Sequence, residues 1–112
     1  MQQYWQDTVH GTIAGSAAAP MTWNASGEQA TDMAVFTCTA SAATVLHVRE
    51  AKTLAELDAA PETDLFHEFT KACGAGVTER LVIPRDPSLP FGRAWVATGS
   101  GNYVLNSSRF KA

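Results

Sequence analysis

The chain has 112 residues, of which 46% are apolar and only 17% are charged, and its formal net charge is −3. This length predicts a single domain over residues 1–112 that can fold around one core without a metal or a disulfide. A charged share below the roughly 25% of an average domain leaves the surface to uncharged polar side chains or to another protein. Low charge also weakens repulsion between copies and so favours assembly.

The positive charges occupy only the second part of the chain, because no Lys or Arg precedes Arg49. Nucleic-acid binding depends on cations that neutralise phosphates, so we expect no nucleic-acid partner. No apolar run approaches the ~18 residues that span a bilayer, and we expect no membrane partner. The first residues carry an acid and no cation, unlike a secretory signal, so we expect folding in the cytosol. Cys38 and Cys73 are then expected to be free thiols.

The first 32 residues lack a sustained pattern. One short strand is predicted at Val9–Ile13, and residues 1–8 form an extended N-terminal arm in this interpretation. The large aromatic side chains of Tyr4 and Trp5 are costly to leave in water. We therefore expect them either to fold back onto the domain or to anchor to a partner.

Two strands are predicted next, from the alternation of side chains along 32–41 and 44–50. The first places four small or apolar residues on one side, namely Ala34, Phe36, Cys38 and Ala40. Because the connection between the two segments is short, we expect them to pair as an antiparallel hairpin.

The β pattern breaks after residue 51. Thr53 and Glu56 have the spacing of a capping box, and Pro61 ends the pattern, which predicts one short helical turn. The segment 63–73 fits two structures, because its apolar residues lie on one helical face but its neighbours are mostly strands. We favour a strand, and a helix here would make the fold α+β.

The last third of the chain predicts a strand at Val77–Pro84, a proline-rich loop, and a hairpin over Gly92–Ser108 with a glycine turn. Six or seven short strands separated by turns are typical of an antiparallel β-sandwich. The expected fold is therefore mainly β, a jelly-roll or immunoglobulin-like sandwich with one short helical turn.

The residues that carry chemistry form no recognisable catalytic or metal-binding motif. His10, His47 and His67 lack the spacing of metal ligands, and no serine stands in a G-x-S-x-G turn. His47 is expected on the wetter side of its strand together with Arg49. We expect no enzyme, no metal and no cofactor.

Tryptophans suggest a second kind of function, since flat aromatic rings stack on sugars. Trp95 stands within a strand beside Val96, which favours a core position. Trp23 stands beside Asn24 and close after Pro20, which favours exposure.

Two segments, "VTERLVIPRDPSLP" and "PFGRAWVATGSGNYVLNSSRFKA", resemble the C-terminal half of small β-sandwich cement or decoration proteins of tailed bacteriophages. The earlier "TVLHVREAKTLAEL" is similar to a strand and long connection in the same proteins. The resemblance covers roughly residues 44–112.

This resemblance implies a structural protein of the virion, made in the host cytoplasm, that bridges neighbouring capsid subunits. Its partners would be the major capsid protein and copies of itself, in a homo-oligomeric assembly. Interface energy concentrates in buried aromatic residues, so we predict Tyr4, Trp5 and Trp23 as anchors. The alternatives are a tail or neck component, or a ligand-binding or adhesion module of immunoglobulin-like or carbohydrate-binding type.

Overall fold

The computed structural model describes residues 2–14, 21–24, 33–57, 66–84, 88–97 and 100–111. These residues contain eight strands and one helical turn. They are β1 (Gln2–Ala14), β2 (Met21–Asn24), β3 (Met33–Ala40), β4 (Thr44–Ala51), α1 (Leu54–Leu57), β5 (Phe66–Cys73), β6 (Thr78–Pro84), β7 (Phe91–Ala97) and β8 (Ser100–Lys111).

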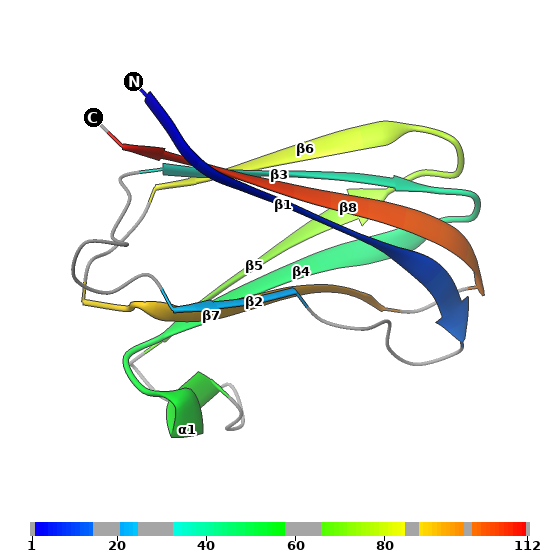
Figure 1. Ribbon diagram of the computed structural model, residues 1–112. Coiled ribbons are helices and arrows are strands. Elements are labelled where there is room, and N and C mark those ends of the chain that lie inside the picture. Colours follow the sequence, from blue (N-terminus) through cyan, green and yellow to red (C-terminus); the bar gives the residue numbers. More distant parts are fainter. Residues whose placement is uncertain are drawn as a thin grey trace.

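The strands form two four-stranded sheets that face each other (Figure 1). Sheet A has the order β1-β8-β3-β6 and sheet B the order β2-β7-β4-β5. Every pairing between strands is antiparallel. The predicted antiparallel β-sandwich is confirmed, and this strand order is that of a jelly roll.

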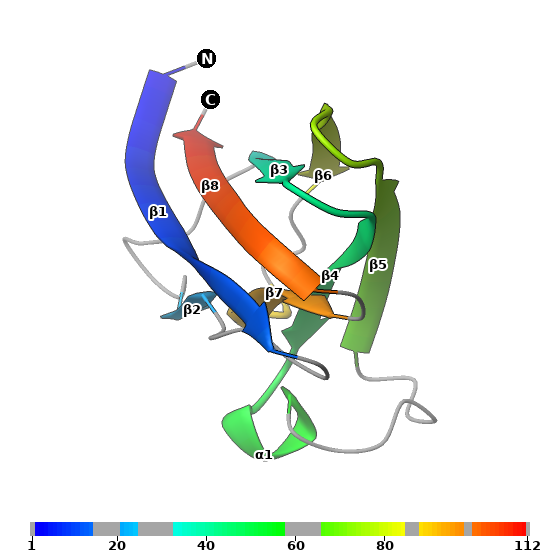
Figure 2. The same ribbon diagram turned by 90° about the vertical axis from the view of Figure 1, so that its right-hand side faces the viewer.

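The strand pairs show that the chain is one long hairpin rolled into a sandwich. β1 pairs with β8, β2 with β7, β3 with β6, and β4 with β5. Paired residues such as Gln2 and Lys111, or Ala51 and Phe66, are separated from the middle of the sequence by nearly equal numbers of residues. The middle of the sequence lies close to α1. The two ends of the chain consequently lie side by side (Figures 1 and 2).

Both predicted hairpins are wrong in their pairing. β3 and β4 lie in different sheets, and so do β7 and β8. The short connection after β3 therefore carries the chain from one sheet to the other. Alternation of side chains predicts which residues share a face, but not which strand pairs with which. Of the expected glycine turn, residues 98 and 99 lie outside the described part of the chain.

The corner between β3 and β4 is held by the start of β8. The Ser41 amide donates to the Asn102 carbonyl at 2.8 Å, and the Asn102 amide donates to Ser41 Oγ at 2.8 Å. Gly101, with φ of +113°, allows this contact, because a Cβ there would lie 2.4 Å from Ser41 Oγ. Gly101, which was predicted to form a hairpin turn, therefore allows β8 to approach the corner after β3, far from it in the sequence.

Three other predictions have clear outcomes. Segment 66–73 is the strand β5, as favoured, while 63–65 lie outside the described residues. The capped turn is confirmed, since the Glu56 amide donates to Thr53 Oγ1 at 3.2 Å. The prediction of an N-terminal arm is wrong, because residues 2–8 belong to β1 and pair with β8.

No described helix has the length and apolar character needed to cross a membrane.

The core lies between the sheets and follows the predicted alternation. Ala34, Phe36, Cys38 and Ala40 are at most 2% exposed, and Leu46, Val48, Val96 and Leu105 face them from other strands. The thiols of Cys38 and Cys73 are both free and buried. Burial, and then the neighbouring Cys73, raise the pKa of Cys38 to about 12, so its reactive thiolate is scarce at neutral pH.

Trp23 belongs to this core, which corrects the expectation that it is exposed. Only 6% of the residue is accessible. Its indole lies over Gly92, where a Cβ would stand 2.2 Å from Cε2 of the ring. The Arg109 guanidinium covers the indole with Cζ 3.9 Å from the ring centroid. Because Gly92 has no side chain, the Trp23 indole of the neighbouring strand can occupy the space above it.

The same end of the core contains two buried charged residues of opposite sign. Arg109 and Glu50 are each 1% exposed. Burial of an ion is costly unless other groups compensate its charge, and the Trp23 ring supplies part of that compensation for Arg109. This end of the sandwich therefore depends on the placement of the indole.

Replacing Gly92 with Ala is expected to lower the free energy of unfolding by about 1–3 kcal/mol, because the added methyl group overpacks the site of the Trp23 indole. Urea denaturation followed by tryptophan fluorescence measures the change. Gly74→Ala is the matched control, since a Cβ there meets Val77 Cγ2 at an ordinary 3.8 Å. Equal stability of the two variants would contradict the role assigned to Gly92.

Candidate functional site

The outer face of sheet A, here called face A, carries little charge where its side chains are described. On β3, β6 and β8 it consists of the odd-numbered residues from Met33 to Thr39 and the even-numbered residues from Thr78 to Pro84 and from Val104 to Phe110. Arg80 is the one charged residue in this set. Val82 and Val104 are 45% and 41% exposed. Face A therefore offers apolar and uncharged polar side chains to a partner.

Strand β1 forms one edge of sheet A. Such an edge presents backbone groups that can pair with another chain, and natural edges are commonly protected by Lys, Pro or short length. β1 has 13 residues, and its sequence QQYWQDTVHGTIA contains no Lys, Arg or Pro. Apart from the register shift between Gln3 and Trp5, the sequence of β1 therefore contains little that opposes pairing with another chain.

The predicted anchors occupy two different environments. Tyr4 and Trp5 belong to β1, with a register shift between Gln3 and Trp5, but their side chains lie outside the described part. Their role in an interface stays a prediction. Trp23 is enclosed in the core of the folded domain and does not present its ring to a partner.

The outer face of sheet B, here called face B, has a different chemistry. The rings of His47 and Trp95 stack there at 5.1 Å with an interplanar angle of 8°. Trp95 is half-buried on this face, so the expectation that it belongs to the core is wrong. Its neighbours Ala94 and Val96 take the inward positions of β7. The position of His47 beside Arg49 on the outer side of β4 is confirmed.

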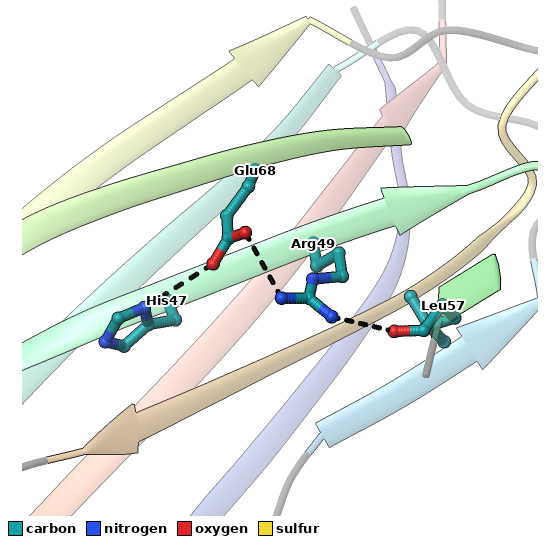
Figure 3. Close-up of polar contacts among 4 residues, drawn as sticks. All are labelled: His47, Arg49, Leu57 and Glu68. Atoms are coloured by element: carbon teal, nitrogen blue, oxygen red, sulfur yellow. Dashed lines mark hydrogen bonds and ion pairs between the residues drawn. The ribbon is translucent and has the colours of Figure 1, made fainter. Parts of the chain in front are cut away.

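Arg49 connects three elements of face B (Figure 3). Its Nη2 lies 3.2 Å from Glu68 Oε2 on β5, and its Nη1 donates to the Leu57 carbonyl of α1 at 3.1 Å. α1 packs against β4 and β7. Arg49 itself is only 8% exposed, and its contact with Leu57 is buried while its contact with Glu68 is partly buried. Arg49 therefore holds α1 at the end of face B.

A second arginine stands opposite the first. Arg93 on β7 is directly in register with Arg49 on β4. Their guanidinium carbons lie 4.9 Å and 5.7 Å from the centroid of Trp95. Like charges directly opposite in a sheet are destabilising, and the Trp95 ring and Glu68 offset part of that cost. Among the described residues of face B, two arginines accompany one acid.

His47 is neutral at pH 7. Burial lowers the pKa of its imidazole from 6.5, and the positive charge of Arg49 lowers it further, against the opposing effect of Glu68. Glu68 Oε1 lies 4.0 Å from Nδ1, too far for a strong ion pair. The stacked pair of rings is therefore uncharged under ordinary conditions.

This lowered pKa predicts an acid-sensitive contribution to stability. The unfolded chain binds a proton at His47 as the pH falls through about 6.5, while the folded chain binds it only at lower pH, so protonation favours unfolding. We expect His47→Gln to reduce the loss of unfolding free energy between about pH 7.5 and 5. Urea denaturation across this range measures the difference, and identical pH dependence of the two proteins would contradict it.

No metal-binding cluster occurs in the described part, because no three His, Cys, Asp or Glu residues are grouped to hold an ion. The side chains of His10 and His67 lie outside it. The sequence analysis placed His47 beside Arg49 but did not predict that Trp95 and Arg93 join them, because those two residues come from a separate strand. Register between β4 and β7 brings them together.

No known protein family and no curated protein matches the sequence. Among solved structures, the chain is similar to a family 11 carbohydrate-binding module from Clostridium thermocellum in complex with a β-1,3-1,4-mixed-linked tetrasaccharide. The TM-score is 0.54 and the identity 9%, over 99% of this chain and 88% of that one. A protein of the disulfide-linked pili of Bacillus endospore appendages gives a TM-score of 0.42 and 14% identity, over 100% and 93%.

The 9% identity to the carbohydrate-binding module shows a shared fold and no more. The similarity to the carbohydrate-binding module agrees with the β-sandwich found here. Neither structure is a capsid decoration protein. The resemblance to phage cement proteins is therefore supported only at the level of the β-sandwich.

Proposed function

We propose that this protein is a structural component of a bacteriophage virion, a cement protein that bridges neighbouring subunits of the capsid. The observation that carries the proposal is face A, a sheet surface with exposed valines and Arg80 as its one charged residue among those described. The sequence resemblance supplies the partner, which is the major capsid protein. A tail or neck protein would use such a surface in the same way.

The chemistry of face A suits a permanent interface. Burying an exposed valine side chain contributes up to about 1.5 kcal/mol, and Val82 and Val104 are both available for it. Burying an unpaired charge would cost energy instead, and face A contains few groups of that kind. Its threonine, serine and asparagine side chains can supply hydrogen bonds to a partner.

The β1 edge is a second surface, through which copies of the protein would contact each other. A strand from another chain could extend sheet A there through backbone hydrogen bonds. Such pairing would link cement subunits to each other while face A rests on the capsid. The proposed protein is thus a homo-oligomer on the virion that needs no cofactor and performs no catalysis.

Lysine at both exposed valines, Val82→Lys with Val104→Lys, is expected to abolish binding to capsid particles, because two ammonium groups would have to lose water in the interface. Co-sedimentation of the purified chain with particles measures binding, and thermal unfolding checks the fold. Thr70→Lys, at an exposed position of β5 in sheet B, is the control. Unchanged binding by the double variant would overturn the proposal.

A second candidate function is carbohydrate binding through face B. The observation that favours it is the half-buried Trp95 stacked on His47, since aromatic side chains and a few polar groups are typical of ligand sites. The similarity in fold to a carbohydrate-binding module supports the same candidate.

A further inference from the structure

We propose that Cys38 and Cys73 form a site of covalent modification, at which a small-molecule disulfide oxidises the two thiols to a disulfide bond that joins sheet A to sheet B. The inference goes beyond the proposed function, because it concerns the core between the sheets and neither exterior face. Both cysteines are thiols in this structure, so the disulfide is a second covalent state of the same fold.

The fold brings the two thiols together from different sheets. Cys38 belongs to β3 of sheet A, and Cys73 is the last residue of β5 of sheet B. Both side chains are part of the one hydrophobic core, with 0% and 1% of each residue exposed. The side chains of Cys38 and Cys73 are hydrogen-bonded to each other. Two cysteines in contact across the core are also what joins the sheets in β-sandwiches that contain an inter-sheet disulfide.

The backbone next to the two cysteines keeps their strands close. Two residues after each cysteine, Ala40 and Ala75 form a parallel bridge, and the Gly76 amide donates to the Ala40 carbonyl at 2.8 Å. Packed sheets usually stand about 10 Å apart, whereas bridged strands are about 4.8 Å apart. A disulfide spans Cα atoms separated by about 4.4–6.8 Å. The sheets therefore meet at this corner closely enough for the bond to form.

The reaction consists of two successive thiol–disulfide exchanges. A thiolate of the pair first attacks one sulfur of oxidised glutathione, which forms a mixed disulfide and releases one glutathione thiolate. The other cysteine then loses its proton and attacks the protein sulfur of the mixed disulfide, which releases the second glutathione thiolate. The two released thiolates take up the two protons. The pair is thus oxidised by two electrons, and one oxidised glutathione is reduced to two thiols.

Cys73 is the thiol placed to react first. It ends an edge strand of sheet B and precedes an exposed turn, in which the Val77 amide donates to the Gly74 carbonyl at 3.2 Å. Cys38 lies within β3, between β8 and β6. Strand ends open at a lower free-energy cost than central strands. Burial also raises the pKa of Cys38, so we expect oxidation to be slow until this corner opens.

The disulfide would change the stability of the whole domain. It would close a loop of about 35 residues that contains β4 and α1. Such a cross-link restricts the unfolded chain and so favours the folded one. By linkage, the fold stabilises the disulfide by the same factor as the disulfide stabilises the fold.

The test measures the equilibrium between dithiol and disulfide in the full chain. The protein is equilibrated with mixtures of reduced and oxidised glutathione, folded in buffer and unfolded in urea, starting from both the reduced and the oxidised chain. Remaining thiols are alkylated in denaturant, and the intact mass counts them. We expect the folded chain to favour the disulfide at least about tenfold more strongly than the unfolded chain does.

Thermal unfolding provides a second measurement. The oxidised chain is expected to unfold at a temperature at least about 5 °C higher than the same chain reduced with dithiothreitol. Cys38→Ala and Cys73→Ala are the matched controls, since each retains one thiol and should gain no stability from oxidised glutathione. Each variant is compared with itself, so a loss of stability caused by the substitution does not affect the result.

The outcomes decide whether the fold holds the two sulfur atoms in position to bond. Peptide mapping that finds Cys38 joined to Cys73 within one chain would support the proposal. The same equilibrium in the folded and unfolded chains would overturn it, and so would a lower unfolding temperature of the oxidised chain. A disulfide that links two copies of the chain on a non-reducing gel, in place of the internal bond, would overturn it as well.

Discussion

Backbone pairing between the two halves of the chain is the constraint on which the rest of the structure depends. Each strand of the first half pairs with its counterpart in the second half, from β1 with β8 inward to β4 with β5. Such contacts join residues far apart in sequence, and the entropy of closing these loops must be offset by pairing and core burial together. Once the long hairpin rolls up, β3 with β8 and β4 with β7 complete the sheets.

Rolling the hairpin creates one interior and two exterior faces, and the side chains differ among them. The interior takes the small and aliphatic residues, and at one end it also takes Trp23, Arg109 and Glu50. The indole fills the space above Gly92 and covers a buried guanidinium. The Trp23 indole therefore contributes both packing and electrostatic stabilisation, so the stability of the end of the sandwich near α1 depends on where this ring lies.

The exterior faces differ because their strands contribute different residues. Face A combines valine, proline, threonine and asparagine side chains with Arg80. Face B gathers Trp95, His47 and two arginines, and α1 packs beside it. A domain of this architecture can be attached through one sheet and present the other, because the core separates the two surfaces.

The sequence by itself determined the mainly β fold, most strand positions, the two sides of β3 and the capped turn at Thr53, because alternation and capping are local properties. Only the tertiary structure decided that residues 2–8 form a strand, that β3 and β4 lie in different sheets, and that Trp23 rather than Trp95 is in the core. Alternation divides a strand into two sides without saying which side faces inward. That choice depends on partners such as Gly92 and Arg109, which stand about 70 and 85 residues beyond Trp23 in the chain.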